Sequence, residues 1–268
     1  MQRVLLIPAR FTDHRMWAGI PERLARRAAV SHLDQLISLP WTAGSDAVVG
    51  LARSQAPAGW DVVVAAGQAC PFAVALGAAG LARGIVLAEP EIPFDRIPED
   101  VDVAIEPPDA DVLAPYEQLV AALHDADPDQ WRTLIMQVVR QTSLAGLPPA
   151  ELDLAVQIAG DHAAETRAEL LAFEAASGAD RALPDPVQLA GLRARGQWLD
   201  QLTALTIPIV TVVPAGRRFV AETIGRLAAH QEAVLTDGTI LVGGALPGVR
   251  EQAAAAIERM LNRLSRQD

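Results

Sequence analysis

Three ionisable side chains follow stretches of sequence that predict buried strands. Glu89 ends the apolar run 84–89, and Arg10 and His14 come shortly after the run 3–8. Burial can raise the pKa of a carboxyl group into the range that a general base needs. Arginine can hold an anionic substrate group, and histidine can move protons near neutral pH. We therefore expect Glu89, Arg10 and His14 to be catalytic residues for a proton-transfer reaction.

Each of the three residues also has a structural interpretation. Glu89 could cap the edge of a sheet or pair with Arg10. The Arg10 side chain could fill the site instead of binding a substrate, and His14 could be solvated on a loop. The sequence alone leaves these alternatives open.

Strands and helices alternate in the first ninety residues. Runs rich in β-branched residues predict strands, and runs rich in Ala, Leu and Arg predict helices between them. The expected strands cover 3–8, 35–39, 61–66 and 84–89, and the expected helices cover 18–29, 46–55 and 70–81. Such alternation implies right-handed crossovers and a parallel sheet, an α/β fold.

Residues 109–202 have a different pattern, in which the strand signal disappears. Helices are predicted there at 113–124, 128–142, 150–158, 162–177 and 186–195. Strand signals return at 207–213 and 233–236, with a helix near 220–229 between them and a last helix at 248–264. We therefore divide the chain into a core of residues 1–108 and 203–268 and a helical insertion of residues 109–202.

The segment from Val62 to Gly77 predicts a buried strand, a tight turn and an apolar helix. It resembles the nucleophile elbow of the α/β-hydrolases, in which a strained turn within a G-x-S-x-G motif presents a serine. Gly67 matches the first glycine, Ala69 occupies the serine position, and Pro71 replaces the closing glycine. The chain thus resembles an α/β-hydrolase that lacks its nucleophile.

The resemblance extends over nearly the whole chain. The segment from Leu5 to Trp17 resembles the family's first strand and the loop that supplies an oxyanion-hole N–H. The family fold is a mostly parallel sheet flanked by helices, and residues 109–202 would form its helical lid. The resemblance implies a covered pocket in which the N–H groups of Phe11 and Cys70 bind an oxygen. The residues expected to bind the substrate are Phe11, Trp17, Gln68, Ala69, Cys70, Tyr116 and Thr239.

The other members of the family's catalytic triad are also missing. Gly216, Arg217 and Arg218 stand where the acid is expected, and Thr239 stands where the histidine is expected. Serine hydrolysis requires nucleophile, base and carboxylate to act together, so this chain cannot assemble that chemistry. Cys70 could replace the serine as a thiol nucleophile, but no histidine occupies a matching position. A buried structural cysteine is the other interpretation.

Composition restricts the partners further. The net charge is −11 and all 22 basic residues are Arg, which argues against nucleic acid as a partner and excludes a lysine Schiff base. No run reaches the roughly 18 apolar residues of a membrane span, so we expect no membrane partner. A single Cys favours a cytoplasmic location. We expect no metal and no cofactor, because the five histidines lack ligand spacing and the turn lacks a glycine-rich phosphate loop.

These observations favour a non-hydrolytic enzyme of the α/β-hydrolase fold. We expect elimination, such as loss of a carboxylic acid, or cyclisation on a small apolar carbonyl compound. Elimination enzymes of bacterial tetronate polyketide pathways are similar in this respect, which suggests a tailoring step on a polyketide in antibiotic biosynthesis. The alternatives are a catalytically silent ligand-binding protein and a residual esterase that uses Cys70. The sequence leaves open whether the chain forms a homodimer.

Short-chain aryl esters are expected to be hydrolysed no faster than in buffer, because Ala69 offers no oxygen nucleophile. The measurement is release of nitrophenol from nitrophenyl acetate by purified protein, with Cys70→Ala as the matched variant. Hydrolysis that is lost in Cys70→Ala would contradict this expectation and support a thiol mechanism.

Overall fold

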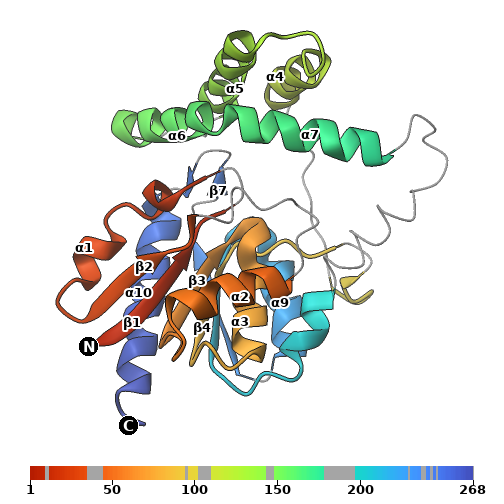
Figure 1. Ribbon diagram of the computed structural model, residues 1–268. Coiled ribbons are helices and arrows are strands. Elements are labelled where there is room, and N and C mark those ends of the chain that lie inside the picture. Colours follow the sequence, from red (N-terminus) through yellow and green to blue (C-terminus); the bar gives the residue numbers. More distant parts are fainter. Residues whose placement is uncertain are drawn as a thin grey trace.

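Six parallel strands form the central sheet of the computed structural model, with helices on both of its faces (Figure 1). The strand order is β2-β1-β3-β4-β5-β6. The strands are β1 (Gln2–Ile7), β2 (Ala28–His32), β3 (Val62–Ala66), β4 (Ile85–Ala88), β5 (Ile209–Pro214) and β6 (Gln231–Thr236). The structure describes residues 1–9, 12–34, 45–93, 96–101, 110–142, 148–177, 197–228, 230–236, 240–241, 244–245 and 247–267.

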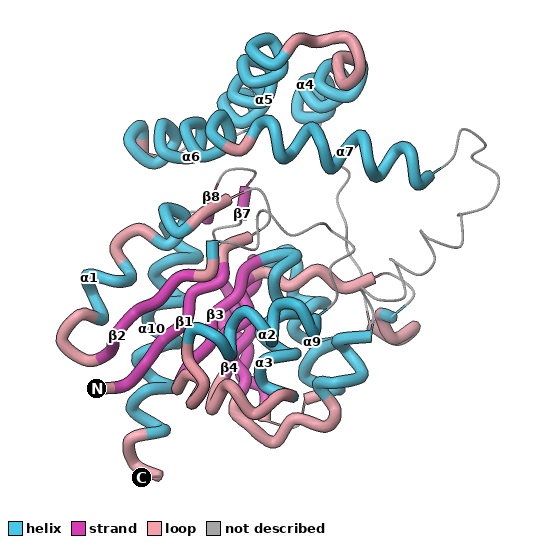
Figure 2. Tube along the Cα trace, viewed as in Figure 1, coloured by secondary structure: helices cyan, strands magenta, loops and turns pink. Residues whose placement is uncertain are grey.

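Alternate residues of the central strands enter two separate apolar layers. Val63 and Ala65 of β3 pack with α2 (Ser45–Gln55), α3 (Cys70–Ala78) and α9 (Arg218–Leu227). Val62 and Val64 face the opposite layer, which contains α1 (Ile20–Leu24) and α10 (Pro247–Leu264) (Figure 2). Because β3 and β4 are buried along their whole length, their continuous apolar sequences match a parallel sheet covered on both faces.

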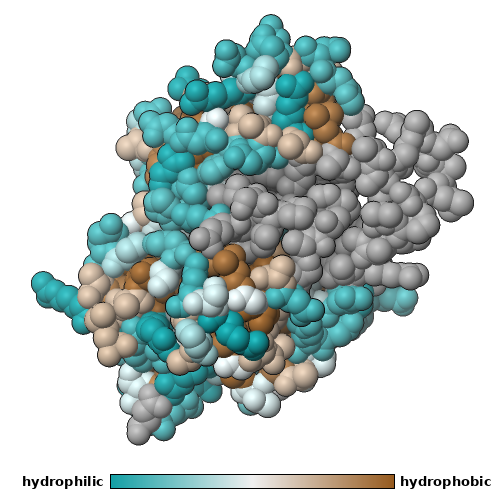
Figure 3. Space-filling view, in the orientation of Figure 1, coloured by the Kyte–Doolittle hydropathy of each residue, from teal (hydrophilic) through white to brown (hydrophobic). Residues whose placement is uncertain are grey.

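Four further helices lie over the carboxyl ends of the strands (Figure 1). They are α4 (Ala110–Ala121), α5 (Pro128–Thr142), α6 (Pro149–Asp161) and α7 (Ala163–Ser177), and we call them the helical group. Trp131, Ile135 and Val138 follow the helical spacing on α5 and are buried among these helices. The face of the group that is visible in Figure 3 is mostly hydrophilic, so its apolar side chains are turned inward.

Helix α6 is attached to the core near both of its ends. Near its start, Glu151 forms an ion pair with Arg250 of α10, whose side chain is only 9% exposed. At its other end, Asp161 forms an ion pair with Arg15, which lies in the loop region after β1, at an N–O distance of 2.9 Å. Both contacts join a carboxylate to an arginine that belongs to the core.

Most predicted strands are confirmed, but the position of the second strand differs from the prediction. The prediction of one helix over 18–29 is wrong, because α1 ends at Leu24 and residues 28–32 form β2, which pairs with β1. This edge strand is short, and its residues are mostly small and of mixed polarity, so they give only a weak strand signal. Its conformation is determined by backbone pairing with β1 more than by the intrinsic preferences of its residues. The predicted strand 35–39 and helix 186–195 lie outside the described residues.

The second half of the chain follows the predicted pattern with shifts of a few residues. The helix at 128–142 is confirmed as α5, and the expected helices at 113–124, 150–158 and 162–177 correspond to α4, α6 and α7. A short antiparallel pair, β7 (Ile240–Leu241) with β8 (Gly244–Ala245), was not predicted. It carries too few residues to give a periodic signal.

Replacing Arg250 with Gln is expected to loosen helix α6. Glu151 would lose its charged partner, and a half-buried carboxylate without a partner is costly. Hydrogen–deuterium exchange, followed by mass spectrometry of peptides from α6, should then be faster than in the wild type. Arg259→Gln is the matched control, because Arg259 lies on the same helix and pairs with Glu232 at an exposed site. Equal exchange in both variants would show that the Arg250 pair does not hold α6.

Candidate functional site

The ends of the three central strands meet at one point of the sheet edge. The pairing of Ala66 with Ala88 places Gly67 beside Glu89, one residue beyond the strands. The pairing of Ile7 with Ala65 in the same way places Ala9 on the other side of Gly67. Residues 9, 67 and 89 are therefore neighbours at the carboxyl edge, where open α/β sheets bind their ligands.

The sharp turn after β3 occurs at Gly67. This residue has a φ of +52°, whereas Ala69 has ordinary right-handed helical angles. A β-carbon added at Gly67 would lie 3.7 Å from Cβ of Ala9, so position 67 faces the loop after β1. The strained residue of a nucleophile elbow is the nucleophile itself. The strained position of the turn is therefore Gly67, two residues before Ala69, the residue that the sequence aligned with the serine.

Cys70 is a structural residue in this arrangement. Its side chain is fully buried, and its Sγ donates to the carbonyl oxygens of Ala65 and Ala88 at 3.4 and 3.7 Å. Burial raises the pKa of the thiol well above its ordinary value, so the reactive thiolate is disfavoured. The expected oxyanion contact of the Cys70 N–H is also wrong, because this N–H donates to the carbonyl oxygen of Gly67.

Glu89 combines burial with backbone strain. Its side chain is 3% exposed, and among the described residues it is the one non-glycine residue with a positive φ, at 47°. Pro90 follows directly and restricts the backbone further. Oε2 of Glu89 lies 3.9 Å from Nη1 of Arg217, which follows β5. Strain of this kind is found preferentially at functional sites, where the surrounding structure holds it in place.

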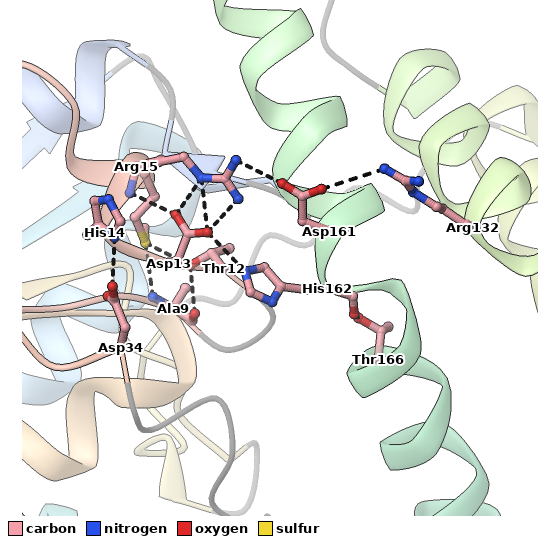
Figure 4. Close-up of polar contacts among 11 residues, drawn as sticks. Ala9, Thr12, Asp13, His14, Arg15, Asp34, Arg132, Asp161, His162 and Thr166 are labelled. Carbon is pink, nitrogen blue, oxygen red and sulfur yellow. Dashed lines mark hydrogen bonds and ion pairs between the residues drawn. The ribbon is translucent and has the colours of Figure 1, made fainter. Parts of the chain in front are cut away.

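A partly buried network connects the loop after β1 with the helical group (Figure 4). Asp13 accepts hydrogen bonds from the guanidinium of Arg15 at 2.6 to 3.0 Å and from the backbone N–H of Arg15 at 2.9 Å. Oδ2 of Asp13 also lies 3.0 Å from Nε2 of His162, the residue between α6 and α7. Burial alone would raise the pKa of Asp13, but these hydrogen bonds more than offset burial and hold the pKa well below its ordinary value.

His162 and Asp13 were not identified by sequence reasoning as site residues. They are 149 positions apart, and a histidine at a helix boundary gives no local signal of its function. The loop that carries Asp13 is fixed to the strand end by Thr12, whose hydroxyl and N–H both donate to the carbonyl oxygen of Ala9. The loop that carries Asp13 is therefore anchored at Ala9, beside Gly67.

Other predicted site residues lie in different surroundings. His14 is 54% exposed, and its Nδ1 lies 2.6 Å from Oδ2 of Asp34. Trp17 is fully buried in the layer with α10, and Gln68 is exposed on the turn after Gly67. Tyr116 lies within α4. Arg10, Phe11 and Thr239 lie outside the described residues, and their roles stay predictions.

The described part of the chain contains neither a metal-binding cluster nor a membrane-spanning helix. The His, Cys, Asp and Glu side chains of this part form no group of three that could hold a metal ion. Its helices are also too short or too polar for any of them to cross a lipid bilayer.

Comparison with known proteins identifies the fold. No family model matches the chain, and no curated protein matches it in sequence. A loop variant of the haloalkane dehalogenase DbeA from Bradyrhizobium elkanii matches in structure with a TM-score of 0.62 and 16% identity, over 100% of this chain and 92% of that one. An esterase from Thermogutta terrifontis matches with a TM-score of 0.51 and 14% identity, over 98% and 90% of the two chains. MenH from S. aureus also matches with a TM-score of 0.51 and 14% identity, over 98% and 94%.

The chain has the α/β-hydrolase fold, as the sequence predicted. At these identities the likeness concerns the fold alone. The activity of this protein must therefore be argued from its own residues.

Asp13→Asn is expected to reduce the pH dependence of stability. The pKa of Asp13 is lower in the folded chain than in the unfolded chain, so its stabilisation is complete above the unfolded pKa of about 4 and is lost as the pH falls further. At neutral pH the variant should be less stable by about 2 kcal/mol, and this difference should shrink toward about pH 2. Urea unfolding across this pH range measures the effect.

Asp153→Asn serves as the control, because Asp153 is an exposed residue of α6. A difference between wild type and Asp13→Asn that stays constant with pH would contradict the ionised, paired state of Asp13.

Proposed function

We propose that the protein is a non-hydrolytic enzyme that catalyses elimination on a small apolar carbonyl compound. The observation that carries the proposal is the pair of neighbouring residues with positive φ: Gly67 offers no nucleophile, and beside it Glu89 offers a buried carboxylate. An elbow without a side chain cannot form an acyl-enzyme, whereas a buried carboxylate can act as a general base.

Glu89 would take a proton from the carbon next to the substrate carbonyl. The electron pair of the broken C–H bond would form the new double bond, and a carboxylate group on the neighbouring carbon would leave with the electrons of its C–O bond. During the reaction, negative charge develops on the carbonyl oxygen. Nη1 of Arg217 lies 3.9 Å from the Glu89 carboxylate, and the N–H of Gln68 follows the elbow residue, where the fold places an oxyanion donor.

The remaining groups around the strand ends favour an apolar substrate. Ala9, Ala66, Ala69 and Ala88 are small and apolar, so their side chains offer a ligand no hydrogen bonds. We infer that residues 109–202 form the lid of this site, that the core comprises residues 1–108 and 203–268, and that the substrate is a polyketide-type carbonyl compound. Arg10 would hold an anionic group of that substrate.

A catalytically silent binding protein is the second candidate. It is favoured by the same small apolar residues, which would suit a bound metabolite as well as a substrate. A binding function does not explain the buried carboxylate of Glu89 on its strained backbone, however, because an apolar ligand does not need a carboxylate partner.

The proposal is tested with β-acetoxypropiophenone, a small apolar β-acyloxy ketone. Elimination gives phenyl vinyl ketone and acetate, whereas hydrolysis gives the β-hydroxy ketone and acetate, so chromatography of the organic product separates the two reactions. We expect enone formation above the rate in buffer. Binding of the ketone, seen as a rise in melting temperature, without any enone would contradict the elimination and support the binding protein.

Glu89→Gln is expected to lower the rate of enone formation by roughly a hundredfold or more, because glutamine keeps the shape of the side chain but cannot accept the proton. Glu99→Gln is the matched control, since Glu99 is exposed in the segment that follows β4. Because Gln keeps the shape of Glu89, near-UV circular dichroism should stay unchanged. A near-normal rate in Glu89→Gln would remove Glu89 from the mechanism.

A further inference from the structure

One ring nitrogen of His162 has no hydrogen-bond partner in the described part of the chain. Nε2 lies 3.0 Å from the carboxylate of Asp13, and because that carboxylate is ionised, Nε2 carries the proton and donates it. Nδ1 is buried and makes no hydrogen bond to any described residue. A buried polar atom without a partner is costly, so it calls for an explanation such as a bound ligand, a water molecule or a catalytic role.

The backbone around His162 places the ring at a break between two helices. His162 ends α6 with φ of −103° and ψ of 15°, in the sparsely populated region where many active-site residues are found. The following helix, α7, starts at the next residue. Thr166 donates to the carbonyl oxygen of His162 at 2.8 Å, so the backbone of the break is itself held in place.

Direct contacts link this imidazole to the proposed site. Position 67 faces Ala9, and the carbonyl oxygen of Ala9 accepts two hydrogen bonds from Thr12. Asp13 follows Thr12 in the sequence, and its carboxylate binds His162. Figure 4 shows His162 reaching from the helical group to this loop. Ala9 and Glu89 lie on opposite sides of Gly67, so the loop that binds His162 and the strand end that carries Glu89 flank the position where a ligand over Gly67 would lie.

We propose that His162, oriented by Asp13, is the general acid that protonates the leaving carboxylate through Nδ1. This role rests on the proposed elimination. Asp13 is a positioning residue, because it contacts the imidazole and not the reacting atoms.

The proton balance of this step is complete. Glu89 accepts the proton of the C–H bond, the C–O bond to the leaving group breaks, and the leaving oxygen takes the proton from Nδ1 of His162. The carboxylic acid departs together with the alkene. Glu89 is then protonated and His162 neutral, so one proton passes from Glu89 to His162 through solvent to restore the starting state.

Four charged groups lie around His162. Asp13 contacts the ring directly, and Arg15 contacts both Asp13 and Asp161. Arg132 of α5 lies 3.6 Å from Asp161. These two carboxylates and two guanidinium groups balance in charge.

A purely structural role is the competing explanation, since the contact also joins the helical group to the core. The two roles differ in their dependence on the leaving group. Acetate is a poor leaving group that benefits from protonation, whereas chloride departs without a proton. A general acid therefore accelerates loss of acetate selectively, and a structural tie affects both reactions alike.

The experiment compares β-acetoxypropiophenone with β-chloropropiophenone, which give the same enone. His162→Gln should lower enone formation from the acetoxy ketone by roughly a hundredfold, and Asp13→Asn should lower it in the same direction. Both variants should eliminate chloride within about threefold of the wild-type rate. Glu89→Gln should impair both reactions, because both begin with the same proton abstraction.

His230→Gln is the matched control, because His230 lies at the start of the strands, at the opposite end of the sheet. Near-UV circular dichroism and urea unfolding establish that each variant is folded. Equal losses with both ketones in folded His162→Gln, or no loss with either, would overturn the general-acid role and leave the proposed elimination intact. No enone from either ketone with the wild-type protein would contradict the elimination itself.

Discussion

Burial of the central sheet on both faces determines where chemistry can occur in this protein. Every residue of β3 and β4 is buried, and the backbone groups of these strands are used in pairing with their neighbours. A polar side chain within these strands would have no partner, so ionisable groups can appear only where the strands end. Glu89 follows this constraint directly, as the first residue beyond β4.

The same constraint explains why the helical group is attached through charged residues. The core presents its strand ends and loops to that group, and the contacts of Asp13, Arg15 and His162 are hydrogen bonds and ion pairs. These charges are partly buried, so each carboxylate needs a cation or a ring N–H. The position of the imidazole is thus fixed by the requirement to satisfy Asp13, a requirement of stability that also organises the site.

Much of the fold was predictable from the sequence, because continuous apolar runs flanked by helical patterns carry a strong signal. The location of the elbow was harder to predict, since the motif assigns its first glycine to Gly67 and its serine to Ala69. In the structure, the turn residue with a positive φ is Gly67 and not Ala69. Glycine adopts such a backbone conformation more readily than other residues, which explains its presence at this position. His162 was missed because its partner is distant in sequence and only tertiary packing brings the two together.

The two attachments of α6 restrict how the helical group can move. Glu151 is fixed to Arg250 near one end of the helix, and Asp161 and His162 are fixed to the β1 loop at the other. A body held at two points cannot translate or tilt without breaking one of them. The motion that these two contacts leave free is a rotation about the line that joins them, close to the axis of α6. Torsion about that axis would carry α4 and α5 toward or away from the strand ends, while His162, which lies on the axis, would stay in place.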